Sequence, residues 1–142
     1  MNRLKQNPKI QLNYLNDLTA YDVVGRSLRL TVTYILTSIK FNTTLHLHTK
    51  VGEVDPAPSI TAVYNSACWS EREVWDMFGV FFKDHPDLRR ILTDYNFSGH
   101  PLRKDFPVSG YSDLFFDEKD KKTVYAPIEL TQEYRKYKYL SN

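Results

Sequence analysis

Cysteine is nearly absent from this chain, which has one among 142 residues. A disulfide scaffold and any metal or iron–sulfur site made only of cysteines are therefore excluded. Long apolar runs are absent too, since the longest uncharged apolar stretch, Leu30 to Ile39, is about half a membrane-spanning helix. The few glycines form no phosphate-binding loop. The basic N-terminus lacks the apolar core of a signal peptide, so we expect a chain that works where it is made, or a processed form.

The composition is that of a globular protein, with 42% hydrophobic and 25% charged residues and a formal net charge of +2. Basic residues are concentrated in positions 1–50, but they do not form the dense basic face typical of nucleic-acid-binding proteins. We therefore expect no nucleic-acid partner, and a small nucleic-acid binder is kept only as a weaker alternative.

Two segments alternate between apolar and polar residues, as half-buried strands do. They are Leu28–Ile39 and Thr43–Val51, and the short connection at Phe41-Asn42 predicts an antiparallel hairpin. The positions expected to face inwards are Leu28, Leu30, Val32, Tyr34, Leu36, Leu45, Leu47, Thr49 and Val51. The segment from Leu12 to Asp22 is ambiguous between a helical turn and a strand.

The pattern changes to a helical period after Pro58. Ser59 is a suitable N-cap for a helix that reaches Ala67, and a capping box that begins at Ser70 predicts a second or restarted helix over Glu71–Phe78, ended by Gly79. Prolines and loss of periodicity predict extended structure beyond it. The expected fold is α+β: a hairpin-containing antiparallel sheet packed by one or two helices, then a long loop-rich segment. The expected divisions are a basic arm (1–11), an α+β domain (12–79) and an extended docking segment with the tail (80–142).

Glu71 lies on the apolar stripe of the predicted helix. Because an unpaired buried charge is costly, we expect Glu71 to pair with Arg89 or Arg90. The alternatives are a solvated helix surface, on which Arg72 pairs with Asp76, and acid–base catalysis.

The histidines form no metal motif of specific spacing. His46 and His48 share the outer face of a strand and could bind zinc with Cys68, but solvated histidines are the preferred interpretation. A stand-alone metal-dependent hydrolase that uses His46, His48 and Glu71 is the alternative function from the enzyme class. His85 and His100, each directly before a proline, are expected to hold loops by hydrogen bonds.

Three consecutive motifs closely resemble one known family. They are ACWSEREVWDMFG (67–79), HPDLRRIL (85–92) and DYNFSGHPLRKDFP (94–107). They resemble the signature of the 30-kDa-type subunit (also of the subunit 9 type) of respiratory complex I, the proton-pumping NADH:ubiquinone oxidoreductase. Weaker similarity extends from about Leu15 to the end of the chain.

The resemblance implies a subunit of the hydrophilic arm that carries no redox centre, catalytic residue, cofactor or metal, and that docks against the 49-kDa-type subunit near the place of ubiquinone reduction. It implies a chain that is associated with the membrane only through the complex. The residues expected to form its structural or interface framework are Glu71, Arg72, Glu73, Asp76, His85, Arg89, Arg90, His100, Arg103, Lys104 and Asp105. From its apolar content, we expect the segment Phe82–Pro107 to run across another subunit and to pair its charged groups there.

Two departures from the family pattern bear on these expectations. The family usually has a longer N-terminal α/β portion, so the domain is either truncated or completed by another polypeptide. The plastid NDH relative, an alternative interpretation, tends to have tryptophan at the position of His100, and the histidine favours the mitochondrial or bacterial branch. The expected location is the matrix side of the mitochondrial inner membrane, or alternatively the cytoplasmic side of a bacterial plasma membrane.

Overall fold

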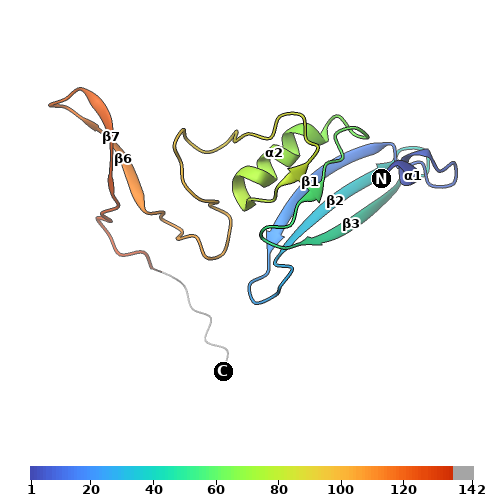
Figure 1. Cartoon of the computed structure of the whole chain (residues 1–142), viewed down its shortest axis with the longest axis horizontal. Coiled ribbons are helices and arrows are strands. Elements are labelled where there is room, and N and C mark those ends of the chain that lie inside the picture. Colours follow the sequence, from blue (N-terminus) through green and yellow to red (C-terminus); the bar gives the residue numbers. More distant parts are fainter. Residues whose placement is uncertain (136–142) are drawn as a thin grey trace. The chain divides into compact units, whose positions relative to one another are not determined.

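An antiparallel three-stranded sheet is the centre of the first of two compact units in the computed structural model, which describes residues 1–135. The units are residues 1–106 and 107–142. The sheet has the order β1-β2-β3, with β1 at Tyr14–Asp22, β2 at Leu30–Ser38 and β3 at Thr43–Val51 (Figure 1). The predicted α+β class and the hairpin of β2 and β3 are confirmed.

The ambiguous segment 12–22 contains strand β1, which has a bulge. The register against β2 shifts between Leu15 and Asp17, so that Leu15 and Leu18, three residues apart, both face the core. A bulge adds one residue to the normal two-residue period of a strand. This spacing resembles a helical one, which is why the pattern alone did not decide between strand and helix.

Strand β2 is central, and its predicted inward side chains are buried from Leu30 to Leu36. The prediction that Leu28 faces inwards is wrong, because Leu28 precedes the strand and is exposed. The connection to β3 is a four-residue turn, since Ser38 pairs with Thr43.

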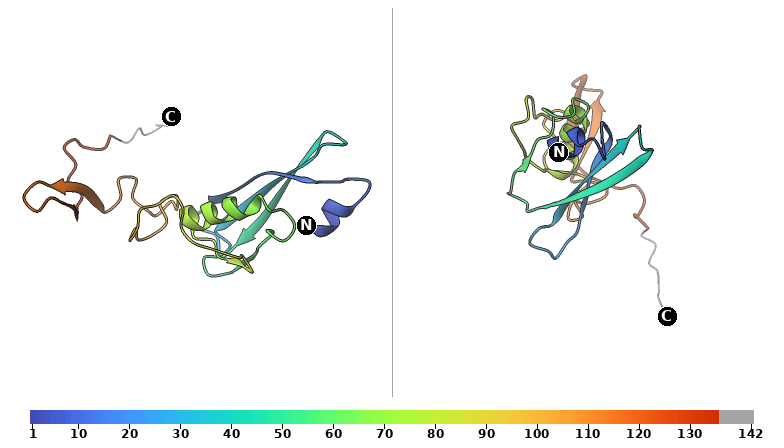
Figure 2. Two further views of the ribbon diagram at one scale, coloured as in Figure 1. Left: turned by 90° about the horizontal axis from the view of Figure 1, so that it is seen from above. Right: turned by 90° about the vertical axis from the view of Figure 1, so that its right-hand side faces the viewer.

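Strand β3 is an edge strand, and of its predicted inward residues only Val51 is fully buried. Leu47 and Thr49 are half-buried, whereas Leu45 is exposed. The reason is that the helix of this unit packs against β1, at the other edge of the sheet (Figure 2).

The main helix is α2, at Ala67–Phe78. Its end at Gly79 was predicted, but its start lies four residues before the predicted Glu71, and Ser70 is inside the helix rather than at a cap. The expected helix over residues 59–67 does not form. Turns replace it, with the Val63 and Tyr64 amides bonded to the Ile60 carbonyl, and they still bury the predicted apolar face.

Short elements join further segments of this unit to its core. Strand β4 at Ala57–Pro58 pairs in parallel with β5 at Phe82–Lys83, and so joins the segments before and after α2. The N-terminal helix α1 at Asn2–Gln6 is tied back by a bond from the Leu12 amide to the Leu4 carbonyl. No helix in residues 1–135 is long and apolar enough to cross a membrane.

The second unit contains a hairpin that the sequence pattern did not predict. Its strands are β6 at Ser112–Asp117 and β7 at Lys122–Pro127. The predicted docking segment and tail (80–142) therefore contain regular structure, and residues 136–142 of the predicted tail lie outside the described part of the chain.

Gly79 ends α2 in a conformation and a space that suit glycine. Its φ is +75°, and its amide donates to the Trp75 carbonyl at 2.9 Å. A Cβ atom there would lie 2.5 Å from His100 Cδ2 and 2.6 Å from Arg103 Nη2. The segment that contains His100 and Arg103 therefore packs directly on the end of the helix.

We expect Gly79→Ala to lower the free energy of unfolding by about 2–4 kcal/mol, from the left-handed backbone and from the clash together. Gly25 is a matched control, because its φ is +89° and nothing lies within 4 Å of its Cβ position. Gly25→Ala should lose only about 1–2 kcal/mol. Urea unfolding of both variants checks this, and equal losses would show that the close packing at Gly79 carries no energy.

Candidate functional site

Two polar networks hold residues 80–106 against the sheet and α2, and together they are the candidate site. One is the α2 network, formed by Glu71, Arg72, Asp76, His85, Arg90, His100 and Arg103. The other is the Arg29 network, formed by Asp22, Arg29, Glu53, Lys104 and Asp105.

Asp76 is the fully buried acceptor of five hydrogen bonds in the α2 network. Its Oδ2 atom accepts three consecutive backbone amides, from Ile91 at 3.1 Å, Leu92 at 2.7 Å and Thr93 at 3.0 Å. Its Oδ1 atom accepts the Thr93 hydroxyl at 2.8 Å and Arg90 Nη1 at 3.2 Å. One carboxylate therefore supplies the partners that three successive amides lack in an irregular loop.

The ionised form of Asp76 is favoured by this arrangement. Burial alone would raise the pKa of the carboxyl, but the hydrogen bonds from Leu92, Thr93 and Ile91 outweigh burial and lower the pKa. The loop therefore folds around a charge that remains ionised at neutral pH.

Glu71 is also fully buried, but the predicted pairing with an arginine is wrong. Its Oε1 accepts the Ile60 amide at 2.8 Å and its Oε2 accepts the Ser59 hydroxyl at 2.7 Å. Arg89 pairs instead with Asp87, and Arg90 pairs with Asp76.

Helix geometry explains this correction. Glu71 and Asp76 are five residues apart, which places them about 140° from each other around the helix. Glu71 therefore faces the segment after β4, whereas Asp76 faces the loop that carries the arginines. Burial raises the pKa of Glu71, and the bonds from Ile60 and Ser59 offset only part of this effect. Burial and the Glu71 charge together raise the pKa of nearby Tyr34 to about 12.

His85 lies beside Glu71. Its Nδ1 atom accepts the Asp87 amide at 3.0 Å, so Nε2 carries the hydrogen and donates to the Cys68 carbonyl at 3.2 Å. Nε2 is 3.9 Å from Glu71 Oε2. The predicted loop-holding role of His85 is confirmed by these bonds.

The C-terminal end of α2 is closed by the segment that follows it. Carbonyls in the last turn of a helix lack partners within the helix. Here the Asp76 carbonyl accepts from His100 Nδ1 at 3.0 Å, the Met77 carbonyl accepts the Leu102 amide at 3.0 Å, and the Phe78 carbonyl accepts Arg103 Nε at 2.6 Å. His100 thus also holds its loop as predicted, and burial lowers its pKa.

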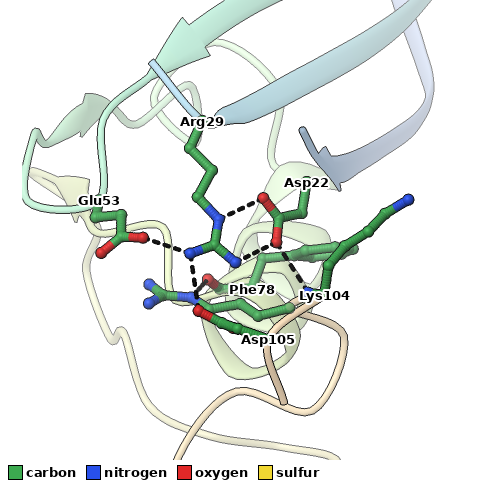
Figure 3. A network of polar contacts seen from close by, with 7 residues as sticks. Asp22, Arg29, Glu53, Phe78, Lys104 and Asp105 are labelled. Atoms are coloured by element: carbon green, nitrogen blue, oxygen red, sulfur yellow. Dashed lines mark hydrogen bonds and ion pairs between the residues drawn. The ribbon is translucent and has the colours of Figure 1, made fainter. Parts of the chain in front are cut away.

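The Arg29 network joins the same segment to the strand ends (Figure 3). Arg29 lies between β1 and β2 and binds three carboxylates: Asp22 by two bonds of 2.5 Å, Glu53 at 2.6 Å and Asp105 at 2.9 Å. Asp22 also accepts the Lys104 amide at 2.9 Å. The hydrogen bonds from Arg29 lower the pKa of Asp22 and that of Asp105.

The remaining predicted framework residues lie at the surface or bind through other groups. Arg72 does not pair with Asp76; its Nε donates to the Arg89 carbonyl at 3.1 Å and its guanidinium lies 5.0 Å from the Trp69 ring centre. Glu73 is exposed. Lys104 takes part through its backbone amide.

The residues proposed for a metal site are not brought together. His48 lies on the outer face of the sheet, where Nδ1 bonds the Thr33 hydroxyl at 2.9 Å, and His46 is on the same face. Cys68 and Glu71 belong to α2, on the inner face. Among residues 1–135, no group of three His, Cys, Asp or Glu side chains could hold a metal ion.

Three members of the Arg29 network were missed by sequence reasoning: Asp22, Arg29 and Glu53. One signal was available, because Asp22 continues the buried positions Leu18 and Ala20 of β1 at two-residue intervals. A carboxylate at a core-facing position of a strand requires a cation, and Arg29 follows Asp22 closely in the chain.

We expect Asp76→Ala to lower the free energy of unfolding by about 3–5 kcal/mol, because three part-buried amides and the Arg90 guanidinium lose their acceptor. Asp87→Ala is the control, since Asp87 is an exposed carboxylate and should change the free energy by no more than about 0.5 kcal/mol. Urea unfolding measures both, and equal small losses would contradict the organising role of Asp76.

We expect Glu71→Gln to retain a free energy of unfolding within about 1 kcal/mol of wild type at pH 7, because the amide oxygen can accept from the Ile60 amide and the amide nitrogen can donate to the Ser59 hydroxyl oxygen, without a buried charge. A broken buried ion pair would instead cost about 3–5 kcal/mol. The folded carboxyl has the higher pKa, so wild-type stability should fall as pH rises above 4.5, the ordinary glutamate value. Urea unfolding measured at several pH values above 4.5 should show no such loss of stability from residue 71 in Glu71→Gln. The loss should remain in the exposed control Glu73→Gln.

Comparison with known proteins relates these networks to a family. A family model described as respiratory-chain NADH dehydrogenase, 30 Kd subunit, matches residues 1–112. The chain is 45% identical over 141 residues to NADH-ubiquinone oxidoreductase subunit 9 of Reclinomonas americana, covering 99% of this chain and 69% of that protein. It is 48% identical over 141 residues to a subunit of the NADH-quinone oxidoreductase of Paramagnetospirillum magneticum, covering 99% and 71%.

Two further matches concern length and fold. The chain is 50% identical over 134 residues to the mitochondrial NADH dehydrogenase (ubiquinone) iron-sulfur protein 3 of Candida albicans, but it spans only 48% of that relative. One chain in the structure of the membrane-bound sulfane sulfur reductase, an archaeal respiratory membrane complex, has a TM-score of 0.59 at 23% identity. That match covers 75% of this chain and 67% of the other, and it shows a shared fold. By the family model and by these identities, the chain belongs to the family of the 30-kDa subunit of respiratory-chain NADH dehydrogenase.

Proposed function

We propose that this chain is a structural subunit, without catalytic residues of its own, in the hydrophilic arm of a proton-pumping NADH:ubiquinone oxidoreductase. The observation that carries the proposal is the family match over residues 1–112, which includes both polar networks. The relatives it resembles bear the names of subunits of NADH-ubiquinone and NADH-quinone oxidoreductases.

The state of the buried carboxylates supports a structural role. A general acid or base must reach a substrate with an oxygen or a nitrogen that can exchange a proton. Both oxygens of Asp76 and both oxygens of Glu71 are instead bonded to backbone or hydroxyl groups of the chain, and neither side chain is exposed. These acids position segments of the protein.

The surface of the same segment supports docking. Three of its charged residues, Arg90, Arg103 and Asp105, bind within the chain, contrary to the prediction that the charged groups of this segment pair across an interface with another subunit. Some of its apolar side chains lie outside, with Leu92 and Leu102 more than half exposed. Docking would therefore bury apolar surface on a segment that is already ordered. We place the 49-kDa-type subunit opposite it.

The second unit adds apolar surface of its own. A lone two-stranded hairpin is marginally stable in water. The exposed apolar residues of this unit are Val108, Tyr111, Leu114, Phe115, Phe116, Tyr125, Leu130 and Tyr134. We propose that this hairpin also contacts neighbouring subunits, and that the assembly holds the chain at the matrix face of the inner membrane.

Native purification tests the proposal. An affinity-tagged copy of the chain should co-migrate in native gels with a very large assembly that oxidises NADH, and should sediment with membranes. Because the chain attaches through other subunits, carbonate at high pH should release it from the membrane. Recovery only as a small species, with no NADH oxidation in its fractions, would contradict the proposal.

A further inference from the structure

The loop from Arg90 to Asn96 is held at its base by hydrogen bonds. Asp76 fixes the amides of residues 91–93 as described above. On the other side, the Arg90 guanidinium lies 5.9 Å from the Phe97 ring centre, and the Phe97 amide donates to the Asp94 carbonyl at 3.1 Å. Phe97 in turn packs on Phe106, with ring centres 5.8 Å apart. The path of the loop is therefore set within the chain.

The tip of this loop presents apolar side chains to the outside. Tyr95 is 96% exposed and Leu92 is 59% exposed. Asn96, at φ +67°, turns the backbone directly after Tyr95. Between these side chains lies a hollow of about 440 Å³, lined only by residues 90–96. The tip thus has both a protruding ring and a recess beside it.

Such a loop has the properties of an interface anchor. Residues that dominate binding are enriched in tyrosine, and they are most effective when the binding segment is ordered in advance, because association then costs little conformational entropy. Here the ordering is supplied by Asp76, which is itself buried. A tyrosine ring that is exposed to this extent, on a loop bonded at its base, offers apolar area that a partner can bury.

The chemistry of the tip favours a protein partner over a lipid surface. Asp94 is exposed between Leu92 and Tyr95, and an acidic side chain is repelled by anionic lipid headgroups. A protein can offer an apolar pocket for the ring, a side chain for the hollow and hydrogen-bond donors for the carboxylate.

We propose that Tyr95 and Leu92 are the anchor residues by which this chain binds another subunit of its complex, with the Tyr95 ring inserted into an apolar pocket that has a hydrogen-bond-donating rim. This inference rests on the proposed function and adds to it the residues that carry the contact and the chemistry of the surface that receives them.

A competition experiment in cells tests the proposal. An untagged wild-type copy and a tagged variant are co-expressed at equal levels, and their ratio in the purified NADH-oxidising assembly is compared with their ratio in the lysate. Tagged wild type should enter at parity, whereas Tyr95→Ala should be depleted by about tenfold or more. Tyr95→Phe keeps the ring and should remain within about threefold of parity. Tyr14→Ala is the matched control, because Tyr14 is an exposed tyrosine at the start of β1.

The outcomes separate the two proposals. Tyr95→Ala at parity, with wild type present in the assembly, would overturn the anchor and leave the proposed function intact. Equal depletion of Tyr95→Phe and Tyr95→Ala would overturn the role of the ring. Absence of the tagged wild type from the assembly would overturn the proposed function and this inference with it. Urea unfolding of Tyr95→Ala should match wild type, so that depletion reports binding rather than misfolding.

Discussion

The structure depends on one buried charge. Asp76 is fully enclosed and ionised, and it remains so only because five donors surround it. A buried carboxylate that loses such donors becomes an uncompensated charge, and a loop that loses such an acceptor leaves its amides unpaired. Helix α2 and the loop after β5 therefore stabilise each other. Without the loop, the Asp76 carboxylate would lack its donors, and without Asp76, the loop amides would lack their acceptor.

In the Arg29 network, too, buried or partly buried charged groups fix a segment without regular structure. A guanidinium between three carboxylates secures residues 104 and 105 to the ends of β1 and β2, and the carbonyls at the end of α2 accept bonds from residues 100–103. Residues 80–106 contain little regular structure, yet their polar groups are bonded at several points. Val80 and Phe82 belong to the core, but Phe81, Leu92, Tyr95 and Leu102 are exposed, so an apolar part of this segment is available to a partner.

The sequence predicted local periodicity well and polar pairing poorly. The hairpin and the end of α2 were visible because alternation and a C-terminal glycine are local signals. Burial of Glu71 was also predicted correctly, from its place on an apolar stripe. Its partner was not, because the choice between Asp76 and Glu71 for the arginines depends on the side of the helix that the loop takes, and this is a tertiary property. The bulge in β1 was not predicted either, and the Asp22–Arg29 pair was missed although Asp22 continues the buried positions of β1. The family was identified from three motifs, and the structure places several of their polar residues in these networks, although the spacing of the motifs alone does not predict this geometry.

The central claim is that residues 90–94 are ordered by the chain itself and not by a partner. Amide hydrogen exchange of the full chain, isolated in the absence of other subunits, tests it most directly. The amides of Ile91, Leu92 and Thr93 should exchange as slowly as those in the middle of α2, because they open only when the Asp76 network opens. Exchange of these three amides at the rate of an unstructured peptide, while α2 remains protected, would contradict the account.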